Sequence, residues 1–395
     1  MSSYRKSRLR SLRCWSIGVW LLAAAGCGTT ELPISSTVPV ATIAVVPASG
    51  TLRVGEALQL FADPRDERGR VLAGRIVSAT SLSPVVASVS PDGVVTALSP
   101  GSSQILISGE GNTTAVSITV VPVVGPIAEC ASPKPGWIWC DDFEQDRLRQ
   151  YFEYGSNGGS FVRAAGVGYG GSTGLRARFL TAGQVDAGFL HLAFGKTPSP
   201  YFRTVDAGTA VYRDIYWRLY VRYPLGWIGG GGNKMSRAQS LVTTNFAQAM
   251  IAHVWSGSRP GDHVPVDRLG FDPASGIGWG GRLLTSSYND FPNLTWLGAS
   301  LSKTAIFDRT RTGRWYCIEA RARLNDPGRS NGILELWIDD HPEARQTGLD
   351  WIGSFRGYGI NAVYIENYWN DGAPQPQERY FDNFVVSTQR IGCLG

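Results

Sequence analysis

The stretch AVYRDIYWRLYVRYP, residues 210–224, decides the fold class of the larger part of this 395-residue chain. Within it Trp217, Leu219 and Val221 are apolar, and the residues between them are aromatic or basic. A period of two places alternate side chains on opposite faces of a β-strand. We therefore expect a strand with one face in a core. The opposite face carries Tyr216, Arg218, Tyr220 and Arg222.

The same alternation recurs along the C-terminal two thirds of the chain. It is found in residues 248–255, 314–324, 332–340, 360–369 and 379–388. Helical periodicity is scarce, and long Gly-rich links join these segments. Residues 130–395 are numerous enough to bury a large core as one unit. We therefore expect residues 130–395 to form two packed β-sheets, a jelly roll.

A smaller β unit precedes this region, over residues 41–122. Short runs of Val, Ile, Leu and Thr alternate there with Gly, Pro, Asp and Ser turns, at the spacing of an immunoglobulin-like β-sandwich. The segment is similar to the bacterial group 2 immunoglobulin-like family, which implies a stalk or adhesive spacer. The matching residues are Ile43, Val45, Pro47, Leu52, Val54, Gly55, Leu58, Leu60, Pro84, Val86, Ala87, Val89, Gly93, Val95, Ala97 and Gly101. Residues 123–129, which contain Gly125 and Pro126, form the expected linker.

The N-terminus has the anatomy of a signal peptide over residues 1–26. Five basic residues precede an apolar run from Trp15 to Ala25 that is short for a permanent transmembrane helix. The ending Ala25, Gly26, Cys27 resembles the lipobox of bacterial lipoproteins, which implies lipidation of Cys27. Gly28 after the cysteine is similar to outer-membrane sorting signals. We therefore expect a lipid-anchored protein of the bacterial cell envelope, at the outer membrane or cell surface, with residues 27–40 as a flexible tether.

The charge of the chain argues against nucleic acid as a partner. The sequence has 37 Lys and Arg against 32 Asp and Glu, and residues 1–26 contain five of the basic residues and no acidic one. The rest of the chain is formally neutral, whereas nucleic-acid binding calls for a basic face. The GxGxxG at Gly166, Gly168 and Gly171 precedes a strand pattern, and Lys234 is not part of a phosphate loop. Nucleotide binding is therefore rejected too.

Four cysteines remain after the signal peptide and Cys27 are set aside. An even number in a secreted protein predicts disulfides. Four cysteines allow three pairings, and the short Pro-Gly-containing loop between Cys130 and Cys140 favours that pair. Cys317 then pairs with Cys393.

Residues 137–395 resemble the concanavalin-type sandwiches of the polysaccharide-lyase-like group. The matching pieces are WCDDFE (139–144), YWRLYVRYP (216–224) followed by a loop with NKMSR (233–237), INAVYIENYW (360–369) and RYFDNFVVSTQRIG (379–392). The resemblance implies β-elimination of a uronic-acid polymer, with His and Tyr as proton-transfer groups. The expected fold class is thus all-β: an immunoglobulin-like β-sandwich followed by a larger concanavalin-like jelly roll.

Elimination across a uronate needs a base, an acid and a group that neutralises the carboxylate. His253, on the strand pattern AMIAHVW, is our candidate base because histidine titrates nearest neutral pH. Tyr364 or Tyr368 would return the proton. The groups that could hold the carboxylate are Arg218, Arg222, Lys234, Arg237 and Gln239. A non-catalytic carbohydrate-binding or adhesion protein displayed on the immunoglobulin-like stalk is the alternative.

Two further expectations concern the polar strand faces and the ends of the domain. Glu335 and Trp337 lie on one face of a strand, where aromatic rings and charged groups suit sugar binding. Asp142 and Glu144 near the start of the domain and Asp382 near its end could meet around a structural calcium ion, since carboxylates suit Ca²⁺. We expect no cofactor requirement, and we expect an acidic polysaccharide as the partner.

Overall fold

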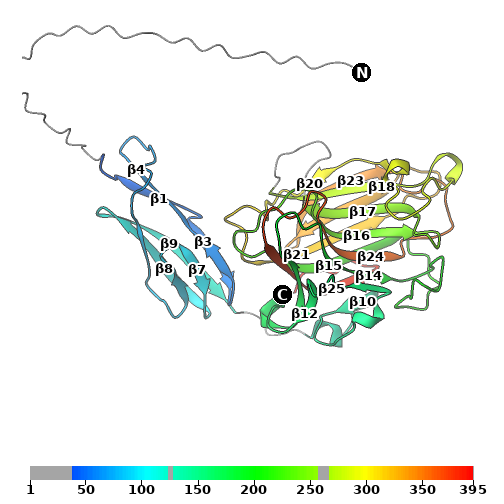
Figure 1. Cartoon of the computed structure of the whole chain (residues 1–395), viewed down its shortest axis with the longest axis horizontal. Coiled ribbons are helices and arrows are strands. Elements are labelled where there is room, and N and C mark those ends of the chain that lie inside the picture. The colour runs from blue at the N-terminus through cyan, green and yellow to red at the C-terminus, as the bar shows by residue number, and fades with distance from the viewer. Residues whose placement is uncertain (1–37, 123–127, 257–266, 395) are drawn as a thin grey trace, which may run out of the picture. The chain divides into compact units, whose positions relative to one another are not determined.

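The computed structural model describes residues 38–122, 128–256 and 267–394 (Figure 1). In this part of the chain every regular element is a β-strand or a single 3-10 turn, which confirms the all-β fold class. No helix in these ranges has the length and apolarity needed to cross a membrane. The predicted signal peptide, Cys27, most of the tether and part of the linker lie outside the described residues and stay predictions.

The N-terminal region forms small sheets with a core of their own. Its strands are β1 (Thr42–Val46), β2 (Ser49–Arg53), β3 (Ala57–Gln59), β4 (Phe61–Arg65), β5 (Ser78–Ser81), β6 (Ala87–Val89), β7 (Val94–Ala97), β8 (Gly101–Gly109) and β9 (Asn112–Val121). They pair in the orders β2-β9-β8-β5, β3-β7-β6 and β1-β4. In the second half of β9 every second residue is buried, namely Val116, Ile118 and Val120. This alternation is the sandwich pattern predicted from the sequence.

The C-terminal region contains two large sheets, which we call the back sheet and the groove sheet. The back sheet contains, in spatial order, β12 (Phe161–Ala164), β13 (Gly174–Phe179), β25 (Gln377–Ser387), β15 (Asp214–Arg222), β21 (Trp315–Arg323), β22 (Gly332–Ile338) and β23 (His341–Leu349), with β10 (Trp137–Asp141) paired to β25. The groove sheet contains β11 (Glu153–Gly155), β14 (Asp186–Ala193), β24 (Ala362–Tyr368), β16 (Lys234–Leu241), β17 (Gln248–Ser256), β18 (Leu269–Ser275) and β19 (Thr295–Trp296), with β20 (Ser300–Leu301) paired to β18. Figure 1 shows β14, β24, β16, β17 and β18 side by side.

The core lies between the two sheets, where the sequence placed it. Trp217, Leu219 and Val221 of β15 are almost fully buried in one cluster with residues of the groove sheet. The indole N–H of Trp217 donates a hydrogen bond of 3.1 Å to Ser236 Oγ on β16, so it is satisfied across the sandwich. The core-facing side of β15 therefore packs against one side of β16, and the other side of β16 faces away from the core.

The segment NKMSR, expected as a loop, is instead the start of the central strand β16. This strand pairs with β24 on one side and with β17 on the other. All eight of its residues are buried, both the apolar and the polar ones. The register of its pairing with β17 shifts between Lys234 and Ser236 and again between Ser240 and Leu241, so the period-two alternation of a regular strand is absent. The sequence of this segment therefore does not predict a strand.

The two predicted disulfides are confirmed. Cys130 pairs with Cys140, and Cys317 pairs with Cys393 over a sequence separation of 76 residues. The second bond ties the C-terminus to β21 of the back sheet. Both ends of the domain are thus held to that sheet, on the side of the molecule away from the groove sheet's outer face.

Candidate functional site

A row of polar side chains crosses six strands of the groove sheet at one level. Directly paired residues of neighbouring strands lie on the same face of a sheet. The row consists of Glu153 (β11), His191 (β14), Tyr364 (β24), Arg237 (β16), His253 (β17) and Asp272 (β18). This face is turned away from the core. The groove sheet therefore concentrates ionisable groups from distant parts of the sequence along one line.

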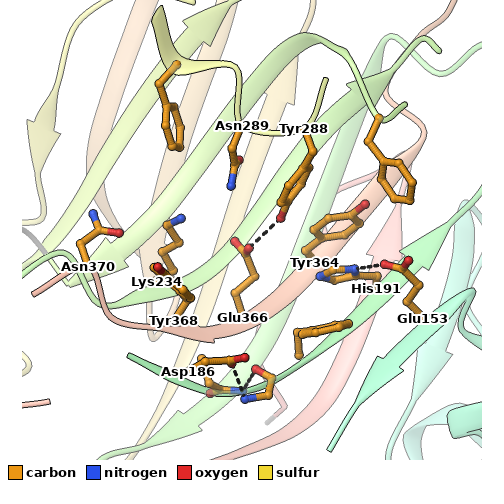
Figure 2. Close-up of a pocket in the computed structure, with 15 residues that line it drawn as sticks. Glu153, Asp186, His191, Lys234, Tyr288, Asn289, Tyr364, Glu366, Tyr368 and Asn370 are labelled. Carbon is orange, nitrogen blue, oxygen red and sulfur yellow. Dashed lines mark hydrogen bonds and ion pairs between the residues drawn. The ribbon is translucent and has the colours of Figure 1, made fainter. Parts of the chain in front are cut away.

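A pocket of about 570 Å³ lies over one end of this row, as Figure 2 shows. Its lining residues are Glu153, Asp186, Gly188, Phe189, His191, Lys234, Phe246, Tyr288, Asn289, Phe291, Tyr364, Glu366, Asn367, Tyr368 and Asn370. In Figure 2, Glu366 lies between Lys234 and Tyr368 on one side and Tyr364 and His191 on the other. Ligand sites are concave and combine aromatic walls with a few placed polar groups. The pocket has this composition.

Lys234 is the cation of the pocket that has no anionic partner within the described ranges. Its side chain is only 6 % exposed, yet no hydrogen bond or ion pair from its ammonium group is found among these residues. The nitrogen lies 4.8 Å from the ring centroid of Tyr368 and 5.7 Å from that of Phe291. Burial lowers the pKa of Lys234, while Glu366 acts in the opposite direction. A desolvated, unpaired ammonium that borders a pocket is a ready site for an anion.

Arg237, by contrast, is already engaged by the protein. It is fully buried, and its guanidinium donates hydrogen bonds of 2.7 Å each to Asn289 and Glu366, and one to the hydroxyl of Tyr288. Tyr288 also donates to Glu366 over 3.2 Å. These contacts hold the pocket residues of β16, β24 and the segment after β18 together. Arg237 therefore orients the pocket, and its charge is balanced before any ligand arrives.

His191 and Glu153 form a hydrogen-bonded pair at the opposite end of the pocket. Nδ1 of His191 lies 2.8 Å from Glu153 Oε2, and Tyr201 donates to the other carboxylate oxygen over 2.6 Å. Burial raises the pKa of Glu153, but the hydrogen bonds from His191 and Tyr201 outweigh this and lower it. With Glu153 ionised, Nδ1 is the donor and Nε2 keeps its lone pair.

The surroundings of His191 favour its neutral form. Its ring is stacked between Phe189 and Tyr364, with ring centroids at 4.4 and 3.5 Å. Burial lowers the pKa of His191 below its ordinary value, although Glu153 pulls it upward. Nε2 has no hydrogen-bond partner among the described residues, and the ring lines the pocket. His191 is thus a neutral imidazole that can accept a proton.

His253, the base expected from the sequence, is in the same row but does not line the pocket. It is 2 % exposed, and both ring nitrogens are buried without a hydrogen-bond partner among the described residues. Its ring lies 5.7 Å from that of Trp255 and 5.8 Å from that of Trp296. Burial lowers its pKa strongly, with further contributions from Arg237 and Lys234. The structure brings His191 to the pocket in its place.

The other candidates of the groove sheet have different surroundings. Tyr368 is partly exposed at the pocket rim beside Lys234. Tyr364 lines the pocket with its ring, but its hydroxyl is buried without a partner in the described part of the chain, and burial raises its pKa far above the ordinary value. Gln239 is fully buried, and Gln248 donates a 2.6 Å hydrogen bond to its side-chain oxygen. Of the two tyrosines, Tyr368 is the one that is open to a ligand.

Arg218 and Arg222, also expected at the site, lie on the back sheet. Arg218 is buried in an ion pair with Glu129 and also donates to the backbone oxygen of Asn383 over 3.0 Å. The guanidinium of Arg222 lies 4.5 Å from the ring centroid of Tyr380. The period-two pattern identified their face of β15 correctly, but that face belongs to the sheet opposite the pocket. Neither residue can meet a ligand bound beside Lys234.

Glu335 and Trp337 are on the back sheet as well. Glu335 accepts ion-pair contacts of 2.9 Å from Arg321 and from Arg345. The ring of Trp337 lies 6.2 Å from that of Tyr216 and 4.8 Å from the Arg390 guanidinium. Glu335 is therefore already paired with two guanidinium groups, and the ring of Trp337 is already in contact with a neighbouring ring and a guanidinium group.

The three carboxylates predicted to hold calcium do not gather in the structure. Asp142 accepts from the backbone N–H of Cys130 over 3.4 Å, and Glu144 accepts from that of Thr173 over 2.8 Å. Burial raises the pKa of Asp382 to about 8. No group of three or more His, Cys, Asp or Glu side chains in the described ranges is arranged to hold a metal ion. The calcium site stays a prediction of the sequence alone.

Sequence reasoning missed Glu153, His191 and Glu366. His191 lies in DAGFLHLA, where apolar residues on both faces conceal the strand. Glu153 lies on a three-residue strand that is too short to show a pattern. Glu366 was visible beside Tyr364 and Tyr368, on the alternating run of β24. Because Glu366 alternates with two candidate tyrosines on the same face of the strand, the sequence could have indicated it as a site residue.

No protein-family model matches the chain, and no curated protein matches it. Among solved structures, the chain is similar to the PL-14 alginate lyase from Aplysia kurodai, at 11% identity over 64% of this chain and 99% of that chain, with a TM-score of 0.43. It is similar to an endo-β-1,4-glucuronan lyase from the fungus Trichoderma reesei, at 8% identity over 64% and 96%, with a TM-score of 0.43. An alginate lyase from Chlorella virus matches at 12% identity over 57% and 88%, with a TM-score of 0.40.

Proposed function

We propose that the pocket binds an acidic polysaccharide and cleaves it by β-elimination. The observation that carries this proposal is Lys234, a buried residue at the wall of the pocket whose ammonium group has no hydrogen bond or ion pair among the described residues. Burying a charge without a partner costs several kcal/mol. A carboxylate from a ligand would supply the missing partner, and the rings of Tyr368 and Phe291 beside Lys234 suit the body of a sugar.

The elimination has three chemical requirements. A base takes the proton from the carbon that bears the carboxylate, and the charge that develops on that carboxylate must be stabilised. The bond to the glycosidic oxygen on the neighbouring carbon then breaks, and a C=C double bond forms between the two carbons. The departing oxygen takes up a proton, so no water is consumed.

The residues of the pocket can be assigned to these requirements. Lys234 binds the carboxylate and stabilises its developing charge. His191, held by Glu153 through a 2.8 Å contact, takes the carbon-bound proton on Nε2. Tyr368, which is 41 % exposed and whose ring lies beside the Lys234 nitrogen, gives a proton to the leaving oxygen. Figure 2 places His191 and Lys234 on opposite sides of Glu366, and all three residues line the pocket.

The paired residues in the pocket keep these groups in place. Arg237 is tied to Glu366, Tyr288 and Asn289, so the β16 and β24 side chains cannot rearrange independently. A preorganised polar site stabilises developing charge without reorganising during the reaction. The Arg237 network is therefore a positioning device, and Lys234 remains the cation that meets the substrate.

The experiment measures ultraviolet-absorbing unsaturated ends after the chain is incubated with alginate, glucuronan and a glycosaminoglycan. The wild type should form them from at least one acidic polymer and from no neutral polymer. Lys234→Met should abolish the signal, whereas Lys303→Met, at an exposed lysine outside the pocket, should not change it. Silence of the wild type on the whole acidic panel overturns cleavage.

A binding protein without catalytic activity would use the same contact with Lys234. Retention of the chain on an immobilised acidic polysaccharide, lost in Lys234→Met and without unsaturated product, would select this alternative. Adhesion through the immunoglobulin-like module is a third outcome, in which binding to cells does not depend on Lys234.

We propose that the chain acts in the bacterial cell envelope, anchored through lipid on Cys27 with the immunoglobulin-like module as spacer. The two disulfides support an oxidising compartment. More than one acyl chain gives stable anchoring where one is marginal. Membrane fractionation of Cys27→Ser tests this: release of the variant into the soluble fraction is expected, and unchanged membrane association would contradict it.

A further inference from the structure

Two exposed aromatic rings continue the groove face beyond the pocket. Phe291, on the 3-10 turn η5 (Phe291–Asn293), is 39 % exposed, and Trp296 on β19 is 41 % exposed. Their ring centroids are 6.4 Å apart, and their planes differ by only 22°. Large apolar side chains exposed together on a soluble protein mark binding surfaces more often than isolated ones do.

Both rings are on the same side of the groove sheet as the pocket. Trp296 is paired with Ala274 of β18 and packs against His253 of the polar row. Phe291 lines the pocket itself, with its ring 5.7 Å from the nitrogen of Lys234. The surface is therefore continuous from Lys234 over Phe291 to Trp296, on the side of the pocket away from His191.

The chemistry of this surface differs from that of the pocket. Among the described residues no cation lies over the ring of Trp296, whereas Lys234 lies beside Phe291. The side chain beneath Trp296 is His253, which burial keeps uncharged. A surface of this kind contacts the apolar face of a sugar ring and has no group that would require a carboxylate.

We propose that Trp296, joined to the pocket by Phe291, forms a second subsite. It stacks on the sugar residue next to the one held by Lys234 and recognises the face of that sugar's ring, whether or not the sugar carries a carboxylate. This subsite rests on the proposed function of the pocket. The pocket then binds only an acidic sugar beside Lys234, whereas the subsite binds an acidic or a neutral sugar at the adjacent position of the polymer. Polymers that alternate uronate and neutral sugars fit this arrangement as well as pure polyuronates do.

The test compares the wild type with Trp296→Ala, Trp296→Phe and Trp279→Ala. Trp279 is 99 % exposed and does not line the pocket, so its variant is a matched control for loss of a surface tryptophan. Affinity is measured by calorimetry for acidic oligosaccharides of increasing length, both pure polyuronates and alternating ones. An aromatic stacking contact corresponds to a change in affinity of up to about tenfold.

The wild type should bind longer oligosaccharides more tightly than the shortest, and Trp296→Ala should lose this gain by up to about tenfold while binding the shortest unchanged. Trp296→Phe should keep most of the gain, and Trp279→Ala should keep all of it. Equal length dependence in the wild type and Trp296→Ala overturns the subsite and leaves the pocket intact. If Trp296→Ala loses affinity for the pure polyuronates but not for the alternating oligosaccharides, recognition of the ring face is overturned. Failure of the wild type to bind any acidic oligosaccharide overturns the proposed function and this subsite together.

Discussion

Replacing Glu153 by Gln should move the acid limb of the pH–rate profile to lower pH. The carboxylate of Glu153 lies 2.8 Å from Nδ1 of His191 and favours the protonated imidazole. Burial already lowers the pKa of His191 below its ordinary value of about 6.5. Without the charge of Glu153, the pKa of His191 falls further. A base is active when unprotonated, so activity then persists to lower pH.

The size of the change follows from the hydrogen bond. A hydrogen bond to a charged group contributes about 1.5–3 kcal/mol, against about 0.5–1.5 kcal/mol for a neutral one. The loss of roughly 1–1.5 kcal/mol corresponds to about one pH unit, because one pKa unit equals about 1.4 kcal/mol. The acid limb should therefore move about one pH unit lower. A weaker base should also lower the plateau rate by roughly threefold.

The assay is kcat/KM for formation of unsaturated ends, measured across the acid range for the wild type and Glu153→Gln. Glu335→Gln is the control, because Glu335 is an ion-paired carboxylate on the back sheet. Its acid limb should coincide with that of the wild type. An unchanged acid limb in Glu153→Gln, or one that moves to higher pH, would refute His191 as the base.

Three further predictions concern stability and are measured by denaturant unfolding. Lys234→Met should leave the free energy of unfolding unchanged or raise it, since the substitution removes an unpaired ammonium group from a buried position. The Kd of this variant for acidic oligosaccharides should rise roughly 10–150-fold, because one charge-assisted hydrogen bond is lost. A large loss of stability would show that Lys234 has a structural role. Arg218→Ala should lower the free energy of unfolding by about 3–5 kcal/mol, because it leaves Glu129 buried without its partner, and KM of the folded variant should not change. Replacing Cys317 and Cys393 together by Ser opens a loop of 76 residues and should cost about 2–4 kcal/mol; an equal midpoint in the reduced wild type and the oxidised one would contradict this.

The strands that could be predicted are those in which apolar residues facing the core alternate regularly with polar or aromatic ones. Trp217, Leu219 and Val221 alternate with polar residues because only one face of β15 is packed in the core between the sheets. In β16, by contrast, register shifts between Lys234 and Ser236 and between Ser240 and Leu241 interrupt the ladder, so the apolar residues Met235, Ala238 and Leu241 do not recur at every second position. Pattern reasoning therefore located the strands with regular alternation, including the fully buried β17, and missed this irregular one.

The site was harder to predict, because a period of two gives the face of a strand but not the sheet to which it belongs. Arg218 and Lys234 both looked suited to hold a carboxylate, yet they lie on different sheets. His191 and His253 are both on strands of the groove sheet. His191 lines the pocket and contacts Glu153, 38 residues away in sequence, whereas His253 does neither, and such long-range placement is not visible in local sequence.

The most direct measurement of the central claim is the mass of the products released from an acidic polymer that the chain binds. Elimination adds no water, so each cleavage should give one new chain end that contains a double bond and one ordinary reducing end, with a combined mass equal to that of the substrate. The wild type should show this mass balance, and Lys234→Met should form no product. Products that together contain one added water per cleavage, or equal product from Lys234→Met, would contradict it.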